Sequence, residues 1–417
     1  MIGLSTTFAG LNRPLRIMLG GILLNALGSG FSLSLLLVYL NDIRGISTVQ
    51  GGWILSWMAV LGLASAGPVG ILIDRIGPVR LLLPGVIVEA IAVGCWALVT
   101  EPWQAWLVAT FIALSGATIW PSQSVIFAQL AGPELRERTF GISFMMLNLG
   151  LGLGGAGAAL IIRDGDVGRF QLLYVVDALT YAFLALAVFL IRHDVAAARA
   201  RIRHEHEQAE LAAEPSYAVI LRDRRLVKLV LGAVIAFTCG YGAIQAGLPV
   251  FATQYADLSA RWIGIIFGAN TLTIVLLQTA VLTWIKGRSR SRLLGLLGAL
   301  WAVSWVVVGL STVWMPVLLL AVSQVIFALA ETIWAPVGPA LLNDMAPDNA
   351  RGRYNATMGL VWGVSGVAGP ALTGQLLGTG HPWVWLNAMF AGAAIGGAIM
   401  YSLRRDLDPR LDGRVGG

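Results

Sequence analysis

Residues 51–99, GGWILSWMAVLGLASAGPVGILIDRIGPVRLLLPGVIVEAIAVGCWALV, contain two long apolar runs separated by a short polar turn. The runs cover residues 51–73 and 79–99, and the turn between them carries Asp74 and Arg75. A helix needs about 20 apolar residues to cross the hydrocarbon core of a bilayer. The apolar residues are continuous rather than alternating, which argues against the strands of a membrane barrel. This stretch therefore predicts two membrane-spanning helices joined by a tight turn.

Apolar runs of the same kind extend over the whole chain. Of its 417 residues, 57% are hydrophobic and only 12% are charged, about half the charged fraction of a soluble domain. We predict an all-α membrane protein with twelve spans. These cover roughly residues 15–40, 51–73, 79–99, 103–128, 139–162, 170–192, 226–252, 260–284, 292–312, 314–342, 353–378 and 382–403.

The charged residues predict how the spans are oriented. The net charge is +6, and the basic residues are concentrated in every second loop between the spans. This pattern indicates membrane topology, and we expect no nucleic-acid partner. The loops on the opposite side carry only a few basic residues, namely Arg44, Arg163, Arg169 and Arg261. The positive-inside rule places the Arg-rich loops and both termini in the cytoplasm.

A charged, Ala-rich stretch divides the spans into two groups of six. We predict an N-terminal six-helix bundle over residues 1–192, a cytoplasmic linker over 193–225, a C-terminal six-helix bundle over 226–403 and a tail over 404–417. The linker holds His204 and His206, but residues two positions apart do not share a helix face. We therefore expect a solvated linker there and no metal site.

The two halves of the chain repeat each other. When the first half is laid over the second, Gly20 falls on Gly232 and Gly28 on Gly240, and Asp177 falls close to Asn387. Two pseudo-symmetric six-helix repeats are typical of transporters, which bind substrate near the midplane at the repeat interface. The chain has no P-loop, HExxH or Cys/His metal pattern, so we expect no enzyme and no metal centre.

Three stretches carry a resemblance to a known family. The turn GILIDRIG at residues 70–77 fits the G-x-L-x-D-R-x-G signature of the major facilitator superfamily. The glycine-rich run at residues 148–155 resembles the antiporter motif of the drug/proton branch, and residues 331–354 are similar to spans ten and eleven of bacterial multidrug exporters. The resemblance implies two six-helix bundles that work by alternating access. The Arg usual in span four of that branch is absent near Ile112.

The resemblance also implies a role for the turn as a conformational latch. Asp74 would bond to the N-terminus of span eleven, where free N–H groups and the helix dipole attract an anion. Gly70 would allow a close helix contact, and Gly77 would permit a sharp reversal. The predicted latch residues are Gly70, Asp74, Arg75, Gly77, Arg80, Arg351 and Arg353. The alternative is a plain turn that only sets topology.

Three acids lie inside predicted spans: Glu89, Asp177 and Glu331. An ionised carboxylate at the bilayer centre costs at least ~2.5–3.5 kcal/mol, so each needs a proton, water or a partner. No basic residue stands at matching depth. By resemblance to the family, span ten lines the cavity, so Glu331 is the first candidate for proton coupling and Glu89 the second. For Asp177, with Asn387 as its counterpart, we expect a structural hydrogen bond.

The resemblance implies that spans one, four, seven and ten line the substrate cavity. The expected cavity residues are Asn25, Trp120, Gln123, Tyr241, Gln245 and Trp334. A few polar groups among aromatic rings suit a bulky lipophilic or cationic compound better than a sugar.

Glycines recur in spans five and eleven and predict close helix packing. The expected packing residues are Gly150, Gly154, Gly157, Gly359, Gly363 and Gly366. Contact between these two spans would seal the external side.

We therefore predict a proton-coupled exporter of hydrophobic or cationic small molecules in the inner membrane of a bacterium. Its partners would be the substrate, protons and the lipid bilayer. It would act as a monomer without a cofactor, with the proton gradient as its energy source. One alternative is a major-facilitator transporter of a single nutrient or metabolite, such as a sugar or a siderophore. The other is a non-transporting membrane receptor or lipid-handling protein.

Overall fold

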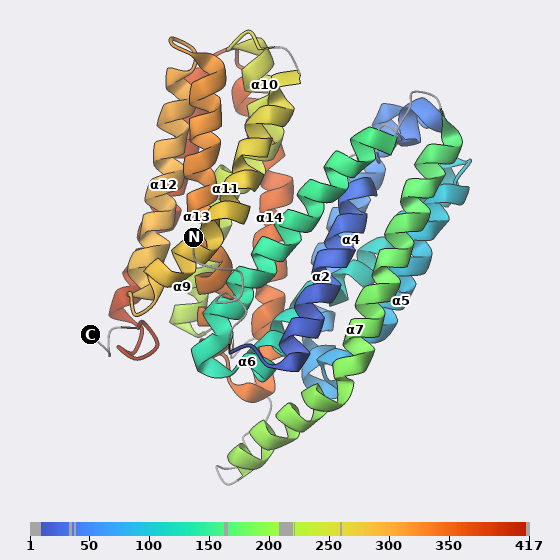
Figure 1. The fold of residues 1–417 in the computed structure, drawn as a ribbon. Helices are drawn as coiled ribbons and strands as arrows, with labels where there is room; N and C mark the ends of the chain where they lie inside the picture. The colour runs from blue at the N-terminus through green and yellow to red at the C-terminus, as the bar shows by residue number, and fades with distance from the viewer. Residues whose placement is uncertain are drawn as a thin grey trace. The chain divides into compact units, whose positions relative to one another are not determined.

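The computed structural model describes residues 10–32, 36, 39–161, 166–207, 220, 222–258 and 261–413. Within these ranges the regular structure is entirely helical (Figure 1). The helices group into two compact units. The first unit contains Gly3–Glu214 together with Pro347–Gly359, and the second contains Pro215–Ala346 together with Leu360–Gly417.

The first unit is built from long helices joined by short turns. Its helices are α2 (Arg13–Ser32), α4 (Thr48–Ile76), α5 (Pro78–Cys95), α6 (Pro102–Ile161) and α7 (Val167–Glu207), with a π-turn at Tyr39–Ile43 and a 3-10 turn at Trp96–Leu98. The 60 residues of α6 would reach about 90 Å if straight, three times the hydrocarbon core of about 30 Å. The chain breaks the helix at Gly132, where φ is 64°. α6 therefore contains two spans.

The helices that lie wholly in the second unit are α9 (Arg224–Phe237), α10 (Ala243–Gln254), α11 (Arg261–Ile285), α12 (Arg290–Leu310), α13 (Pro316–Met345) and α15 (Pro382–Ser402), with a 3-10 turn at Leu403–Arg405. The helix α14 (Arg351–Leu377) belongs to the first unit up to Gly359 and to the second from Leu360, and the 3-10 turn Asp348–Ala350 before it belongs to the first. A π-turn, η4 (Thr238–Gly242), joins α9 to α10. The predicted seventh span is therefore one helical segment with a wider turn in its middle, a feature common at functional sites.

The predicted fold class is confirmed. Among the described residues, eleven helical segments are long and apolar enough to cross a membrane. Because α6 supplies two spans, this agrees with the twelve that the apolar runs predict. Large apolar side chains remain exposed along these helices, for example Ile91 and Leu276, as expected for a surface covered by lipid.

Glycines in the first unit permit close contact between α2 and the second span of α6. A Cβ atom added at Gly154 would lie 2.1 Å from the carbonyl oxygen of Leu27, and one at Gly150 would lie 2.6 Å from the Cβ of Ala26. One at Gly157 would lie 2.7 Å from the Phe31 ring. Within the first unit these glycines pack on α2, where residues 23–31 present their backbone, the Ala26 methyl group and the Phe31 ring. The predicted contact of these glycines with span eleven stays a prediction.

The glycines of α14 have different surroundings. A Cβ atom at Gly359 would lie 2.9 Å from that of Ala66 in α4. Gly363 is half-buried, and a Cβ atom at Gly366 would meet no described atom within 4 Å. Of these three, only Gly359 is shown at a close helix contact.

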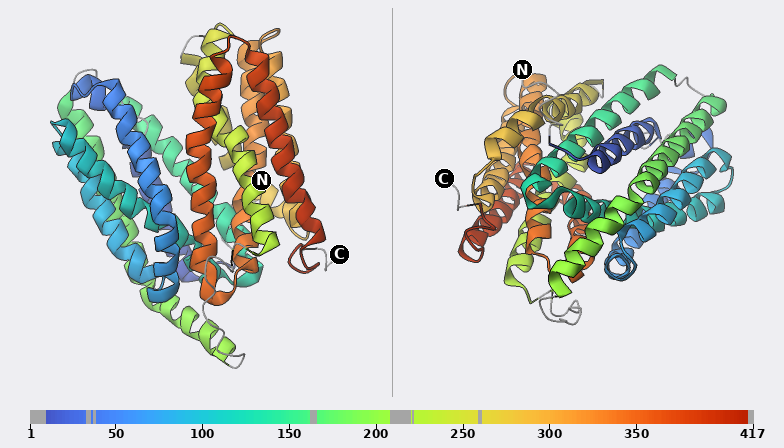
Figure 2. Two further views of the ribbon diagram at one scale, coloured as in Figure 1. Left: turned by 180° about the vertical axis from the view of Figure 1, so that it is seen from behind. Right: turned by 60° about the horizontal axis from the view of Figure 1, so that its bottom comes forward.

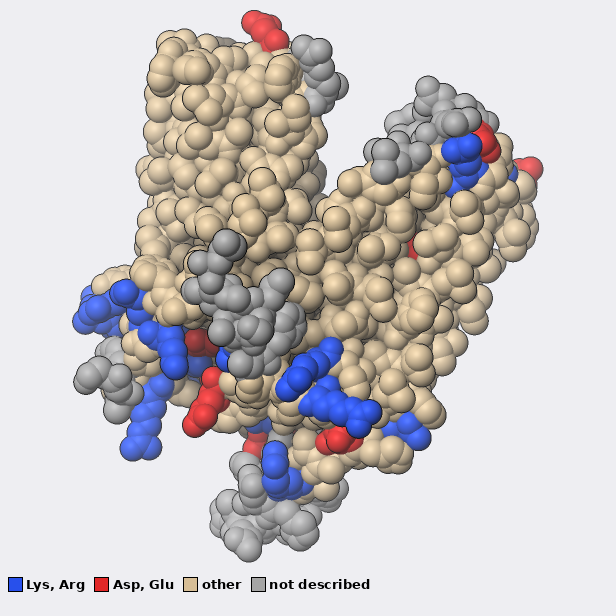
Figure 3. Space-filling view, viewed as in Figure 1, with Lys and Arg blue, Asp and Glu red and all other residues tan. Residues whose placement is uncertain are grey.

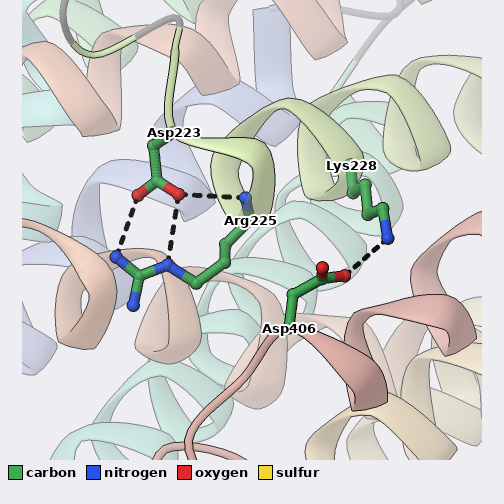
Figure 4. Close-up of polar contacts among 4 residues, drawn as sticks. All are labelled: Asp223, Arg225, Lys228 and Asp406. Atoms are coloured by element: carbon green, nitrogen blue, oxygen red, sulfur yellow. Dashed lines mark hydrogen bonds and ion pairs between the residues drawn. The ribbon is translucent and has the colours of Figure 1, made fainter.

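On the face shown in Figure 3, most of the charged side chains lie near one end of the helices, a few lie at the opposite end, and the sides of the helices carry almost none. In the second unit this end includes two ion pairs (Figure 4). Asp223 caps α9 and pairs with Arg225 at 3.1 Å, and Lys228 pairs with Asp406 after α15 at 2.5 Å. These side chains lie at the start of the seventh span and just beyond the end of the last one.

One helix of the first unit continues beyond its neighbours. α7 extends to Glu207, past the ends of α2 and α5 (Figures 1 and 2). The first part of the predicted linker is therefore a continuation of span six. Residues 208–219 and 221, and the side chains of His204 and His206, lie outside the part of the chain that the structure describes.

Candidate functional site

The turn between α4 and α5 is only one residue long. α4 ends at Ile76, Gly77 follows with φ 96°, and Pro78 begins α5. A positive φ of this kind is strained for residues with a side chain, which explains the glycine at this position. The reversal leaves Asp74 in the last turn of α4, with its side chain only 3% exposed.

Asp74 contacts the first turn of α14, a segment that belongs to the same unit. Its two carboxylate oxygens accept hydrogen bonds from the backbone N–H groups of Gly352 and Arg353, at 2.6 and 3.1 Å. The Arg353 guanidinium lies 3.7 Å from the same carboxylate. The free N–H groups and the dipole at a helix N-terminus stabilise an anion in this position.

The other predicted latch residues occupy different positions around this contact. Arg351 forms an ion pair with Asp348. Gly70 is buried, whereas Arg75 and Arg80 are exposed and lie outside the contact itself.

Sequence reasoning missed Gly352. A Cβ atom there would lie 2.5 Å from the carbonyl oxygen of Gly70 and 2.6 Å from Asp74 Oδ1. A residue with a side chain would therefore separate the two helices and break the hydrogen bonds. The sequence signal for Gly352 was its position between Arg351 and Arg353, two predicted latch residues.

Glu331 lies in the middle of α13 and is 6% exposed. The Asn270 amide, on α11, donates a hydrogen bond of 2.6 Å to its carboxylate. Among the described residues Glu331 has no ion pair. A single neutral partner leaves this group able to exchange a proton without breaking a salt bridge.

Four aromatic side chains of the second unit form a continuous group, which we call the aromatic cluster: Phe237, Tyr241, Trp334 and Trp362. The Phe237 ring contacts each of the other three, with centroid separations of 4.8 to 6.4 Å. Tyr241 meets Trp362 edge to face at 5.1 Å. Phe237 and Trp334 are buried, whereas Trp362 remains 38% exposed.

The aromatic cluster lies near Glu331. Trp334 follows this acid by three residues on α13, one helical turn away on the same face, and Gln245 follows Tyr241 by four residues. The structure thus brings together three predicted cavity residues of this unit and the first coupling candidate. Phe237 and Trp362 were missed, because the sequence offers many aromatic residues and no sign of which ones meet.

The other two buried acids lie in the first unit and have hydroxyl partners. Ser115 donates a hydrogen bond to Glu89, and Ser32 donates one to Asp177. Glu89 is 5% and Asp177 2% exposed. Each carboxylate is thus bonded to a side chain of a different helix. This is the kind of hydrogen bond expected for Asp177, whereas proton coupling by Glu89 stays a prediction.

Three predicted cavity residues also lie in the first unit. Gln123 is buried, and Trp120 is 37% exposed. Asn25 is partly buried, and its amide nitrogen has no hydrogen-bond partner among the described residues. The described part of the chain contains no group of His, Cys, Asp and Glu that fits a metal ion.

Comparisons with known proteins agree with this architecture. The family model described as Major Facilitator Superfamily matches residues 18–314 and 263–416. A multidrug resistance protein MdtH from Photorhabdus laumondii is 25% identical over 82% of this chain and 81% of its own. A Na(+), Li(+), K(+)/H(+) antiporter from Planococcus maritimus is 20% identical over 76% of this chain and 79% of its own.

A solved structure has the same fold. It is a bacterial homologue of the iron transporter ferroportin in an outward-facing state with soaked iron, 12% identical, with a TM-score of 0.75. The match covers 94% of this chain and all of that one.

Proposed function

Because the chain belongs to the Major Facilitator Superfamily, a family of multi-pass membrane transporters for small molecules, we propose that it is a proton-coupled exporter of hydrophobic or cationic compounds that works by alternating access. The observation that carries this proposal is the buried Glu331, with its single neutral partner, beside the aromatic cluster. It would reside in the inner membrane of a bacterium as a monomer, with both termini in the cytoplasm. Its energy source would be the proton gradient.

The composition of the site supports a cationic or lipophilic substrate. Aromatic faces attract cations within about 6 Å of the ring centroid, and Trp362 is partly exposed at the edge of the aromatic cluster. A carboxylate next to such rings balances the positive charge of a substrate. A sugar site would need many more hydrogen-bonding groups than Tyr241, Gln245 and Asn270 provide.

The surroundings of Glu331 support proton coupling. A carboxylate inside a membrane protein is costly when it is ionised and unpaired. Glu331 can avoid that cost by taking up a proton or by pairing with a cationic substrate, and the two are mutually exclusive. This exclusion is the physical basis of exchange between a proton and a cation.

The names of the relatives are consistent with this proposal. One is called a multidrug resistance protein and another a cation/proton antiporter. At identities of 20–25%, the substrate of a relative is not assigned to this chain. The proposal therefore depends on the residues of the site.

Transport by purified protein in vesicles tests the proposal. A pH gradient is imposed, and accumulation of ethidium, a planar aromatic cation, is followed by its fluorescence. We expect uphill transport by the natural protein and its loss in Glu331→Gln, which keeps the size and hydrogen bonding of the side chain but removes the charge change. Movement of ethidium down its own concentration gradient should persist in this variant.

The matched control is Glu134→Gln, which alters an exposed acid and should transport like the natural protein. Accumulation by Glu331→Gln at the natural level would assign a structural role to Glu331 and make Glu89 the next acid to test.

A further inference from the structure

The C-terminal part of α7 packs against the rest of the first unit. Ile191, Val195 and Ala198 are 0%, 2% and 8% exposed, and their spacing places them on one face of the helix. Arg199 follows directly and is half-buried. The extension therefore presents Arg199 to the unit from a fixed position.

Arg199 contacts the turn that carries Asp74. Its guanidinium Nη2 donates a hydrogen bond of 2.7 Å to the backbone carbonyl oxygen of Asp74 and one of 3.5 Å to that of Arg75. Its Nη1 lies where a side chain at Gly77 would be, 2.1 Å from the Cβ position. Gly77 thus provides both a positive φ and the space for this guanidinium.

The contact has a clear physical cause. The last carbonyl groups of a helix have no partner within the helix and carry the negative end of its dipole. A guanidinium bonded to such a carbonyl forms a charge-assisted hydrogen bond, which is stronger than a neutral one. Arg199 therefore caps the C-terminal end of α4 from a helix far away in the sequence.

Asp74 is consequently held at two points. Its backbone carbonyl accepts from Arg199, and its side-chain carboxylate accepts from the first turn of α14 at 2.6 and 3.1 Å. A shift of about 1 Å in the backbone would lengthen these side-chain bonds beyond the normal range of 2.7–3.2 Å. The position of Asp74 therefore depends on the cap.

We propose that Arg199 is a positioning residue of the transport cycle, which fixes the Asp74 turn for its contact with α14 and so makes the start of the linker part of the latch. The proposal rests on the proposed function only in that the chain cycles between two accessible states. It does not depend on the substrate or on proton coupling.

The test measures conformation without substrate or gradient. Spin labels are placed on cysteines at Glu134 and Lys286, both exposed, in full-length protein with Cys95→Ser and Cys239→Ala, and their distance distribution is recorded by double electron–electron resonance. We expect Arg199→Ala to raise the population with separated cytoplasmic ends about tenfold, which corresponds to about 1.4 kcal/mol. Asp74→Asn should shift the distribution in the same direction.

Matched variants separate positioning from general damage. Arg199→Lys should restore part of the natural distribution, because it keeps a charged donor. Arg201→Ala removes an exposed arginine of the same helix and should leave the distribution unchanged. The double variant Arg199→Ala/Asp74→Asn should behave like Asp74→Asn alone, since both act through one contact. Size-exclusion chromatography selects folded protein in every case.

Two results would overturn the inference. If Asp74→Asn shifts the distribution and Arg199→Ala does not, Arg199 contributes packing and does not position Asp74. If the two shifts are additive, Arg199 acts elsewhere. Neither result bears on ethidium transport or on Glu331, so failure of this inference is distinguishable from failure of the proposed exporter function.

Discussion

Asp74 and Glu331 are both buried carboxylates, but their partners suit opposite tasks. Asp74 accepts two backbone N–H groups and has an arginine at 3.7 Å, so its charge is stabilised. Glu331 has one amide partner and no ion pair among the described residues, which is the arrangement expected of the proton exchange proposed for it. Residue type alone does not separate these roles; the number and charge of the partners does.

Trp362 provides a test of substrate recognition at the scale of one residue. Trp362→Leu keeps an apolar side chain but removes the aromatic face, so binding of ethidium should weaken about 2- to 30-fold, as expected for a cation–π contribution of about 0.5–2 kcal/mol. Binding of a neutral lipophilic dye, Nile red, should change little. Both affinities are measured by titration of purified protein.

Trp314→Leu is the control, because Trp314 lies in the turn after α12 and is 65% exposed. Equal weakening for the cationic and the neutral dye in Trp362→Leu would mean that the ring contributes contact area only.

At the scale of helices, the stability of the first unit depends on the contact between α2 and the second span of α6. Gly154→Ala places a methyl group 2.1 Å from the Leu27 carbonyl oxygen, so the helices must separate. We expect a loss of about 1–3 kcal/mol of stability, as for other overpacked sites. Thermal unfolding in detergent measures it.

Gly366→Ala is the matched substitution in α14, where the added methyl group meets no described atom within 4 Å. It should leave the unfolding temperature nearly unchanged. Equal unfolding temperatures for the two variants would show that α2 and α6 separate without cost.

Much of the helical architecture could be predicted from the sequence, because each span must satisfy its backbone hydrogen bonds and expose an apolar surface. The break at Gly132 falls in the gap predicted between the apolar runs 103–128 and 139–162. The contacts between the spans could not be predicted from the sequence. The glycines at 150 and 154 signal close packing without naming the partner helix, and small residues recur in several helices.

The site shows the same limit. The GILIDRIG motif pointed to Asp74, but Arg199 is more than a hundred positions away and lies in a stretch whose composition indicates only a solvated linker. Asn270 likewise has no sequence signal linking it to Glu331. Such pairs depend on how helices rotate against one another, which composition does not determine.

At the scale of the whole molecule, the distribution of charge predicts the orientation in the membrane. The helix α12 connects the turn that contains Lys286 to the turn that contains Val313, and both of these residues are exposed. Because α12 is one span, the two turns should lie on opposite sides of the membrane. In intact cells, a cysteine at Lys286 should resist a membrane-impermeant thiol reagent, because the positive-inside rule predicts that the basic loop lies in the cytoplasm. A cysteine at Val313 should react. Both variants carry Cys95→Ser and Cys239→Ala, and reversed reactivity would invert the topology.

α14 is a single helix of 27 residues, about 40 Å long, whose residues up to Gly359 belong to the first unit and whose remainder belongs to the second. The boundary between the two units therefore falls inside one unbroken ladder of backbone hydrogen bonds. Glycine is the weakest helix former apart from proline, so Gly359, the residue at this boundary, is a point of low bending stiffness in α14.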